Sequence, residues 1–79
     1  MVTLRLFAGI REAAGTGRAS FEAATVDEVI AQATAQFGDV FAEMVPICRV
    51  WLNGEPVDVT TAVKAGDEVA LLPPVSGGG

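Results

Sequence analysis

The sequence lacks histidine altogether and contains a single cysteine, Cys48. One cysteine excludes a disulfide within the chain, and without histidine the chain has too few ligands for a zinc or iron–sulfur site, so we expect no bound metal. Cys48 shares its strand parity with Val50 and Leu52. This pattern predicts a small buried apolar side chain rather than a nucleophile, since no base lies nearby in the sequence.

Positive charge is also scarce. The five basic residues are scattered and the formal net charge is −5, which argues against a nucleic-acid binder because binding phosphates requires a basic stripe. The acidic surface favours solubility, and steering towards a basic partner is a weaker possibility.

Long hydrophobic runs are missing too, although 51% of the residues are apolar. Charged residues or prolines interrupt each apolar run before it reaches membrane-spanning length. The N-terminal segment alternates apolar and polar residues, which is not the continuous apolar core of a signal peptide. We therefore expect a cytoplasmic protein that binds neither membranes nor nucleic acid.

At 79 residues the chain predicts one domain with a modest core. Residues 2–8 alternate as a half-buried strand does, and residues 18–23 form a plausible return strand. Between them we expect a turn, in which Gly15 and Gly17 are available for positive φ.

A helix signal follows at Thr25, which stands three residues before Glu28 in the pattern of a capping box. Gly38 is a natural stop for this helix, and residues 39–45 are expected to add a helical turn. Five apolar residues at helical spacing make the stripe that should face the core: Val26, Val29, Ile30, Ala33 and Phe37.

The rest of the chain reads as strands. Residues 47–54 predict a strand that enters a turn at Asn53-Gly54, residues 56–59 a short edge strand, and residues 68–72 a last strand after a turn at 65–67. The layout predicts an α+β, β-grasp fold, with a mixed four- to five-stranded sheet packed on one main helix. We expect residues 1–72 to form this domain and residues 73–79 to form a flexible C-terminal tail.

Strand alternation predicts an outward-facing apolar patch. If Leu4, Leu6, Val50, Leu52, Val69 and Leu71 face the core, four other residues face out: Phe7, Trp51, Ala70 and Leu72. A patch with two aromatic residues favours a partner surface. The alternative is that a bulge or twist buries some of them, or that isolated apolar residues on the surface have no role.

The tail suits a substrate more than a structural element. It consists of Pro73, Pro74, Val75, Ser76, Gly77, Gly78 and Gly79. Prolines end the strand and favour an extended exit, seven residues reach at most ~23 Å, and glycines can thread a narrow channel. The terminal carboxylate becomes reactive towards sulfur or amine nucleophiles once an ATP-using partner has adenylated it. Ordinary terminal disorder is the alternative.

Three segments carry a resemblance to a known family. The ending "AGDEVALLPPVSGG" (65–78), the segment "LFAGIREAAG" (6–15) and the helix start "TVDEVI" (25–30) resemble the MoaD family of ubiquitin-like sulfur carriers, the small subunits of molybdopterin synthase. The resemblance covers nearly the whole chain, and its Pro-Pro-Val-Ser-Gly-Gly ending is the most specific part.

The resemblance implies a partner-dependent function. In such proteins an E1-like adenylyltransferase, MoeB, uses ATP to adenylate the terminal glycine, which then becomes a thiocarboxylate. The tail enters the large subunit, MoaE, and gives its sulfur to cyclic pyranopterin monophosphate. By position, Gly77 and Gly78 match the terminal Gly-Gly pair, Phe7 and Leu72 match partner-contacting positions, and Arg11 matches an arginine of the family's turn. The chain itself is then no enzyme and binds no cofactor.

One departure concerns Gly79, because such carriers end at Gly-Gly. One extra residue moves the terminal carboxylate by ~3.5 Å, enough to misplace the reacting atom unless the channel accommodates it. Either Gly79 is the residue that is adenylated and receives sulfur, or it is trimmed to expose Gly78. Three other functions stay open: a ThiS-like carrier for thiazole or cysteine synthesis, a protein modifier that forms isopeptide bonds, and an interaction module with an inert tail.

Overall fold

The computed structural model describes residues 1–74. The elements, in chain order, are β1 (Val2–Leu6), α1 (Ala8–Ala14), β2 (Arg18–Phe21), α2 (Val26–Phe37), α3 (Asp39–Met44), a 3-10 turn η1 (Val45–Ile47), β3 (Arg49–Leu52), β4 (Glu55–Pro56) and β5 (Glu68–Leu72). The predicted tail positions 75–79 lie outside the described residues.

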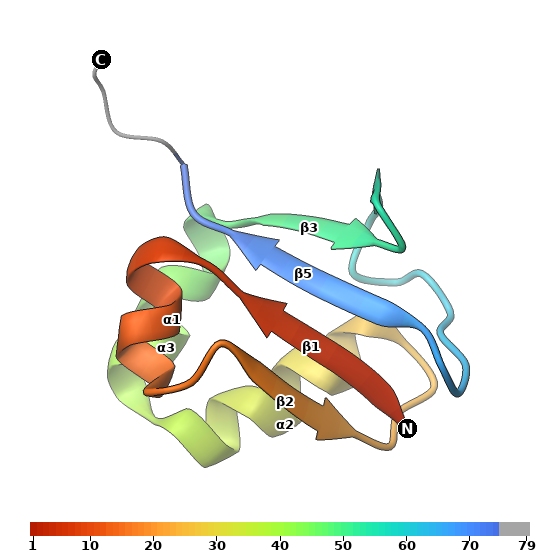
Figure 1. Ribbon diagram of the computed structural model, residues 1–79, viewed down its shortest axis with the longest axis horizontal. Helices are drawn as coiled ribbons and strands as arrows, with labels where there is room; N and C mark the ends of the chain where they lie inside the picture. The colour runs from red at the N-terminus through yellow and green to blue at the C-terminus, as the bar shows by residue number, and fades with distance from the viewer. Residues whose placement is uncertain (75–79) are drawn as a thin grey trace.

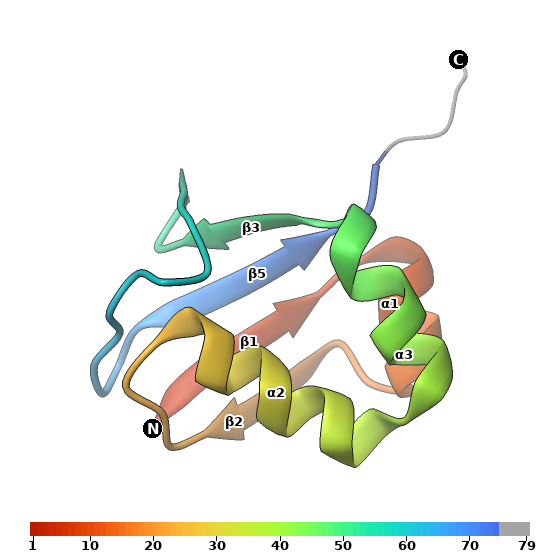
Figure 2. The ribbon, with the colours of Figure 1, turned by 180° about the vertical axis from the view of Figure 1, so that it is seen from behind.

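The five strands form one mixed sheet in the order β2-β1-β5-β3-β4. β1 pairs antiparallel with β2 and parallel with β5, and β3 pairs antiparallel with both β5 and β4. Helices α2 and α3 cover one face of the sheet (Figure 2), while the other face is open to the viewer in Figure 1. This is the β-grasp arrangement that the sequence predicts.

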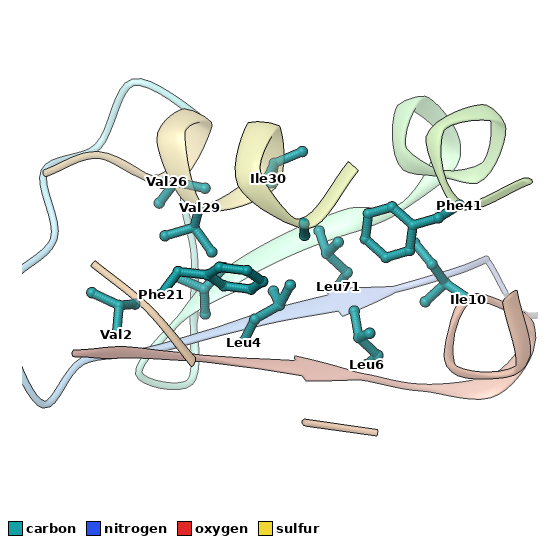
Figure 3. Close-up of a cluster of buried hydrophobic side chains, with 12 residues drawn as sticks. Val2, Leu4, Leu6, Ile10, Phe21, Val26, Val29, Ile30, Phe41 and Leu71 are labelled. Carbon is teal, nitrogen blue, oxygen red and sulfur yellow. The ribbon is translucent and has the colours of Figure 1, made fainter. Parts of the chain in front are cut away.

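The core lies between the sheet and the helices (Figure 3). Its buried members are Val2, Leu4, Leu6, Ile10, Phe21, Val26, Val29, Ile30, Ala33, Phe41, Val69 and Leu71. Strand alternation therefore predicted the inward side chains of β1 and β5 correctly. Phe37, Cys48, Val50 and Leu52 are half-buried and pack against the edge of this core, so the predicted inward direction of Cys48 is confirmed although the residue is not fully buried.

The capping signal of α2 is also confirmed. The backbone N–H of Glu28 donates to Thr25 Oγ1 at 3.2 Å, and Glu28 Oε1 accepts from the backbone N–H of Ala24 at 2.9 Å. Gly38 closes the helix with φ 92°, a backbone conformation that glycine adopts without a steric penalty. The helical turn expected after Gly38 is present as α3.

The prediction is wrong between residues 7 and 17. The first strand ends at Leu6, and α1 replaces the expected turn. Burial of Ile10 stabilises this short helix against the core, and Gly15 ends it at φ 76° by donating its N–H to the carbonyl of Arg11 at 3.0 Å. Gly17, which the sequence indicated as a second residue available for positive φ, does not adopt it.

The edge strand after the hairpin turn is shorter and earlier than predicted. Asn53 and Gly54 do form the turn, with φ of 50° and 86°. Only Glu55 and Pro56 then pair with β3 as β4, instead of residues 56–59. One more hydrogen bond joins the two segments, from the N–H of Val57 to the carbonyl of Val50 at 3.1 Å, and the N–H of Thr61 then donates to the carbonyl of Asp58 at 3.1 Å, which turns the chain away.

Candidate functional site: the open face of the sheet

The open face of the sheet carries a shallow cleft of about 200 Å³. The residues that line it are Phe7, Trp51, Gly54, Glu68, Ala70 and Leu72. All four residues of the predicted outward patch are among them, so the structure brings them together as alternation predicted. Gly54 and Glu68 are additional members that the sequence reading did not place there.

The strand register explains why these side chains meet. Trp51 on β3 stands directly opposite Ala70 on β5, and Ala70 also pairs with Arg5 on β1. The neighbouring position Leu71 is fully buried on the other face, so Ala70 and Leu72 must point to the open face because side chains alternate along a strand. Phe7, which follows β1 directly, is 37% exposed.

Phe7 owes its position to the connection between β1 and α1. It stays extended, with φ −130°, and Ala8 after it takes a left-handed φ of 51°. That conformation costs a non-glycine residue roughly 1–2 kcal/mol. The Arg5 guanidinium lies 5.4 Å from the centroid of the Phe7 ring, a cation–π contact that holds the ring at the edge of the cleft.

A polar network fixes the opposite end of the cleft. Asp67 is largely buried and accepts hydrogen bonds from Asn53 Nδ2 at 3.1 Å and from the backbone N–H of Lys64 at 2.9 Å. The bond from Asn53, and then the bond from Lys64, lower the pKa of Asp67 below its ordinary value of 3.8. Asn53 Oδ1 accepts from the N–H of Glu68 at 2.9 Å, which ties the hairpin turn to β5.

The last described residues of the chain leave from this cleft. Leu72 ends β5, lines the cleft and pairs with Arg49 on β3. Pro73 and Pro74 follow it directly, half-buried and exposed respectively, and no strand includes them. The domain boundary after residue 72 remains a prediction, as do the roles of Val75 to Gly79, which lie outside the described residues.

Arg11 does not line the cleft. It lies in the last turn of α1, and its side chain packs over Gly17, where a β-carbon would come within 3.1 Å of Nε. The partner contact that the MoaD resemblance implies for Arg11 therefore remains a separate prediction.

Among residues 1–74, no group of three or more cysteine and acidic side chains is placed to hold a metal ion. In the same part of the chain, no helix has the length and hydropathy needed to cross a bilayer.

The fold and the cleft together define a ubiquitin-like β-grasp protein with a cleft on its open face. Comparison with known proteins makes this more specific. The profile described as the ThiS family matches residues 4–78. The Haloferax volcanii protein named small archaeal modifier protein 1 is 36% identical over an alignment of 85 positions, which covers 94% of this chain and 97% of that protein. Its crystal structure matches with a TM-score of 0.83 at 31% identity and covers 98% of each chain.

Two solved complexes contain similar chains. One, from Amycolatopsis orientalis, is the BexX/CysO complex, with a TM-score of 0.85, 27% identity, and 99% of this chain and 100% of that chain covered. The other is the complex of subunits 1 and 2 of the molybdopterin-converting factor of Helicobacter pylori, with a TM-score of 0.72, 31% identity, and 98% and 97% covered.

The chain therefore belongs to the ThiS family. It is a ubiquitin-like sulfur carrier or modifier of the ThiS/MoaD superfamily and not a catalytic enzyme by itself. Proteins of this kind act with partner proteins, as the two complexes illustrate.

Proposed function

We propose that this protein is the sulfur-carrying small subunit of a molybdopterin synthase. The observation that carries the proposal is the position of Leu72, which lines the cleft and stands directly before Pro73 and the glycine-rich ending. A large subunit (MoaE-like) that docks on the cleft is then close to the point where the tail leaves the sheet. The likeness to a chain in the complex of subunits 1 and 2 from Helicobacter pylori supports the same partner.

The proposed chemistry takes place at the terminal glycine and in other proteins' active sites. An E1-like adenylyltransferase (MoeB-like) transfers AMP from ATP to the glycine carboxylate and releases pyrophosphate. Hydrosulfide, or a protein persulfide whose sulfur–sulfur bond a second thiol then cleaves, attacks the acyl carbon, AMP leaves, and a thiocarboxylate remains. In the large subunit the thiocarboxylate gives its sulfur to cyclic pyranopterin monophosphate, and the carboxylate returns after hydrolysis. ATP belongs to the activating partner, and this chain supplies the carrier group.

Either Gly78 or Gly79 carries the sulfur. The family profile matches through residue 78, which favours the register in which Gly78 is loaded. Intact mass spectrometry, after incubation with ATP, a sulfur source and the adenylyltransferase of the same organism, tests the proposal. We expect the mass increase of one oxygen replaced by sulfur, mapped to the last residue.

Two shortened chains serve as controls in this experiment. A chain without Gly79 is loaded normally if Gly78 is the acceptor, and a chain without Gly78 and Gly79 is not loaded in either register. Unchanged sulfur transfer by the chain that lacks both glycines would refute the proposal. Co-purification with a thiazole synthase instead of a large synthase subunit would identify a ThiS-like carrier.

The likeness to small archaeal modifier protein 1 favours a second candidate, a protein modifier. The same acyl-adenylate, attacked by a lysine amine in place of sulfur, would release AMP and form an isopeptide bond. High-mass adducts of the full chain in its own cells, absent for the chain without Gly78 and Gly79, would support this candidate.

A further inference from the structure

The open face gathers positive charge in a chain that is acidic as a whole. Arg18 on β2 stands directly opposite Arg5 on β1, and Arg5 stands in register with Ala70 of the cleft. Arg49 on β3 stands opposite Leu72. Since cross-strand partners point to the same face, three of the five basic residues of the chain lie on the open face.

Acidic residues are rare on the strands of this face. Of the ten acidic residues, Glu68 is the one that a strand places on the open face, in register with Thr3. Its carboxylate already faces Arg5, with Nη1 and Oε1 3.8 Å apart. Within residues 1–74, no ion pair joins Arg18 or Arg49 to an acidic side chain. The charge of this face is therefore opposite to the net charge of −5.

Two features of this face are unfavourable in the isolated chain. Like charges directly opposite one another on neighbouring strands, as Arg5 and Arg18 are, destabilise a sheet. The indole Nε1–H of Trp51 is covered and has no acceptor among the described residues, and an unsatisfied buried donor costs about 1–3 kcal/mol. The two guanidinium groups and the indole N–H are all hydrogen-bond donors. A neighbouring molecule that supplies negatively charged hydrogen-bond acceptors would reduce the repulsion between the arginines and would pair with the indole N–H.

We propose that the occupant of the cleft is an acidic segment of a partner protein. Such a segment inserts an aliphatic or aromatic side chain between Trp51 and Leu72, and its flanking carboxylates meet Arg5, Arg18 and Arg49. Carboxylates fit because they only accept hydrogen bonds, whereas lysine and arginine only donate them. The apolar lining of the cleft by Phe7, Trp51, Ala70 and Leu72 favours a protein segment over a nucleic acid.

The inference rests on the proposed function in one respect, namely that a partner docks on this face. It also contradicts the expectation from net charge, because a chain of charge −5 should be steered towards a basic partner. The local arrangement dominates when charges approach within a Debye length of about 8 Å at physiological salt. The two expectations therefore differ in what they predict when arginines on this face are neutralised: association with the partner becomes slower if the partner segment is acidic and faster if the partner is basic.

A partner-free experiment uses the single tryptophan, which lies in the cleft. The probes are two peptides with a central Leu-Phe pair, one flanked by four glutamates and the other by four lysines. We expect the acidic peptide to shift the Trp51 indole N–H resonance in ¹⁵N NMR spectra, and the basic peptide to leave it in place. A stronger shift with the basic peptide, the same shift with a uridine oligonucleotide, or no shift with any probe at millimolar concentration would each overturn the inference.

The second experiment measures association with the adenylyltransferase of the same organism. Combining Arg18→Gln with Arg49→Gln should slow association about three- to tenfold at low salt and flatten its salt dependence. Lys64→Gln is the control for charge removal and is matched to either single arginine variant, because it removes one positive charge from an exposed side chain that does not line the cleft. Faster association of the arginine variant, or an equal effect of the control, would refute the acidic partner.

The two proposals fail in different ways. If the unaltered chain gains its thiocarboxylate but the arginine variant associates as fast as the unaltered chain does, the carrier function stands and the acidic partner is wrong. If no thiocarboxylate forms while the acidic peptide alone shifts the Trp51 signal, the charge inference stands and the carrier function is wrong. Circular dichroism of each variant shows that its fold is intact.

Discussion

Two adjacent leucines on β5 provide the sharpest test of how this chain divides stability from function. Leu71 is fully buried in the core and pairs with Leu6 and Val50, whereas Leu72 is half-buried and lines the cleft. Because the two side chains lie on opposite faces of one strand, substitution to alanine should mainly reduce stability at Leu71 and mainly weaken partner association at Leu72.

Leu71→Ala should lower the free energy of unfolding by about 2–5 kcal/mol, the usual range for a leucine truncated in a closed core. A domain of this size has roughly 4–12 kcal/mol in total, so the urea midpoint should fall by at least about 1 M. Leu71→Val should cost about 1 kcal/mol and keeps the test readable if the alanine variant does not fold.

Leu72→Ala should cost about 1 kcal/mol of stability or less, since much of this side chain stays in contact with water. It should weaken partner association about tenfold or more, which corresponds to roughly 1.4 kcal/mol. Urea unfolding followed by far-UV circular dichroism measures the loss of stability. The rate of thiocarboxylate formation reports the loss of partner association. Equal losses of stability at the two positions, or unchanged loading by Leu72→Ala, would refute the division between the two faces.

Four other predictions concern stability and reactivity. Ala8→Gly should raise the free energy of unfolding by up to about 1 kcal/mol, because it relieves the left-handed φ of 51°; a loss in thermal unfolding would contradict this. Thr25→Ala should lower it by about 0.5–2 kcal/mol through loss of the helix cap, whereas Thr25→Ser should not. Folding lowers the pKa of Asp67, so its contribution to the free energy of unfolding is complete above its unfolded pKa of 3.8 and is lost as pH falls through the lower folded pKa. In the Asp67→Asn variant, the free energy of unfolding measured in urea should therefore depend less on pH in that acid range. Burial raises the pKa of the Cys48 thiol, so iodoacetamide should alkylate it more slowly in the folded chain than in urea.

The elements that the sequence predicted well are those whose signals are local. The alternation of residues 2–6 and 68–72, the Thr25–Glu28 cap and the Asn53-Gly54 turn each depend on neighbours in the chain. The helix α1 escaped prediction because it has only seven residues, includes Gly9 and depends on the burial of Ile10 by distant elements. An isolated segment of this length would not be helical, and the sequence gives no sign of the contact that stabilises it.

Four of the six residues that line the cleft were predictable from the sequence, and their arrangement was not. Alternation along each strand predicts that Phe7, Trp51, Ala70 and Leu72 face outward, but only the register across strands shows that they line one cleft. The cluster of arginines depends on the same register, because Arg5 and Arg18 come together through a pairing that their spacing in the chain does not reveal. The sequence reading accordingly treated the basic residues as scattered.

The topology of the sheet places the start of the predicted tail at the cleft. Since β1 and β5 are parallel neighbours, they end at the same edge of the sheet, where Figure 1 shows the chain leaving β5 beside the end of β1. Phe7 after β1 and Leu72 at the end of β5 therefore lie on the same cleft, and the seven residues from Pro73 onward start there with a reach of at most ~23 Å. An antiparallel pairing would have placed Phe7 at the opposite edge from Leu72. A partner that recognises the cleft thus also determines where the tail can be received, so substitutions in the cleft should impair every reaction of the terminal glycine, whichever nucleophile the partner supplies.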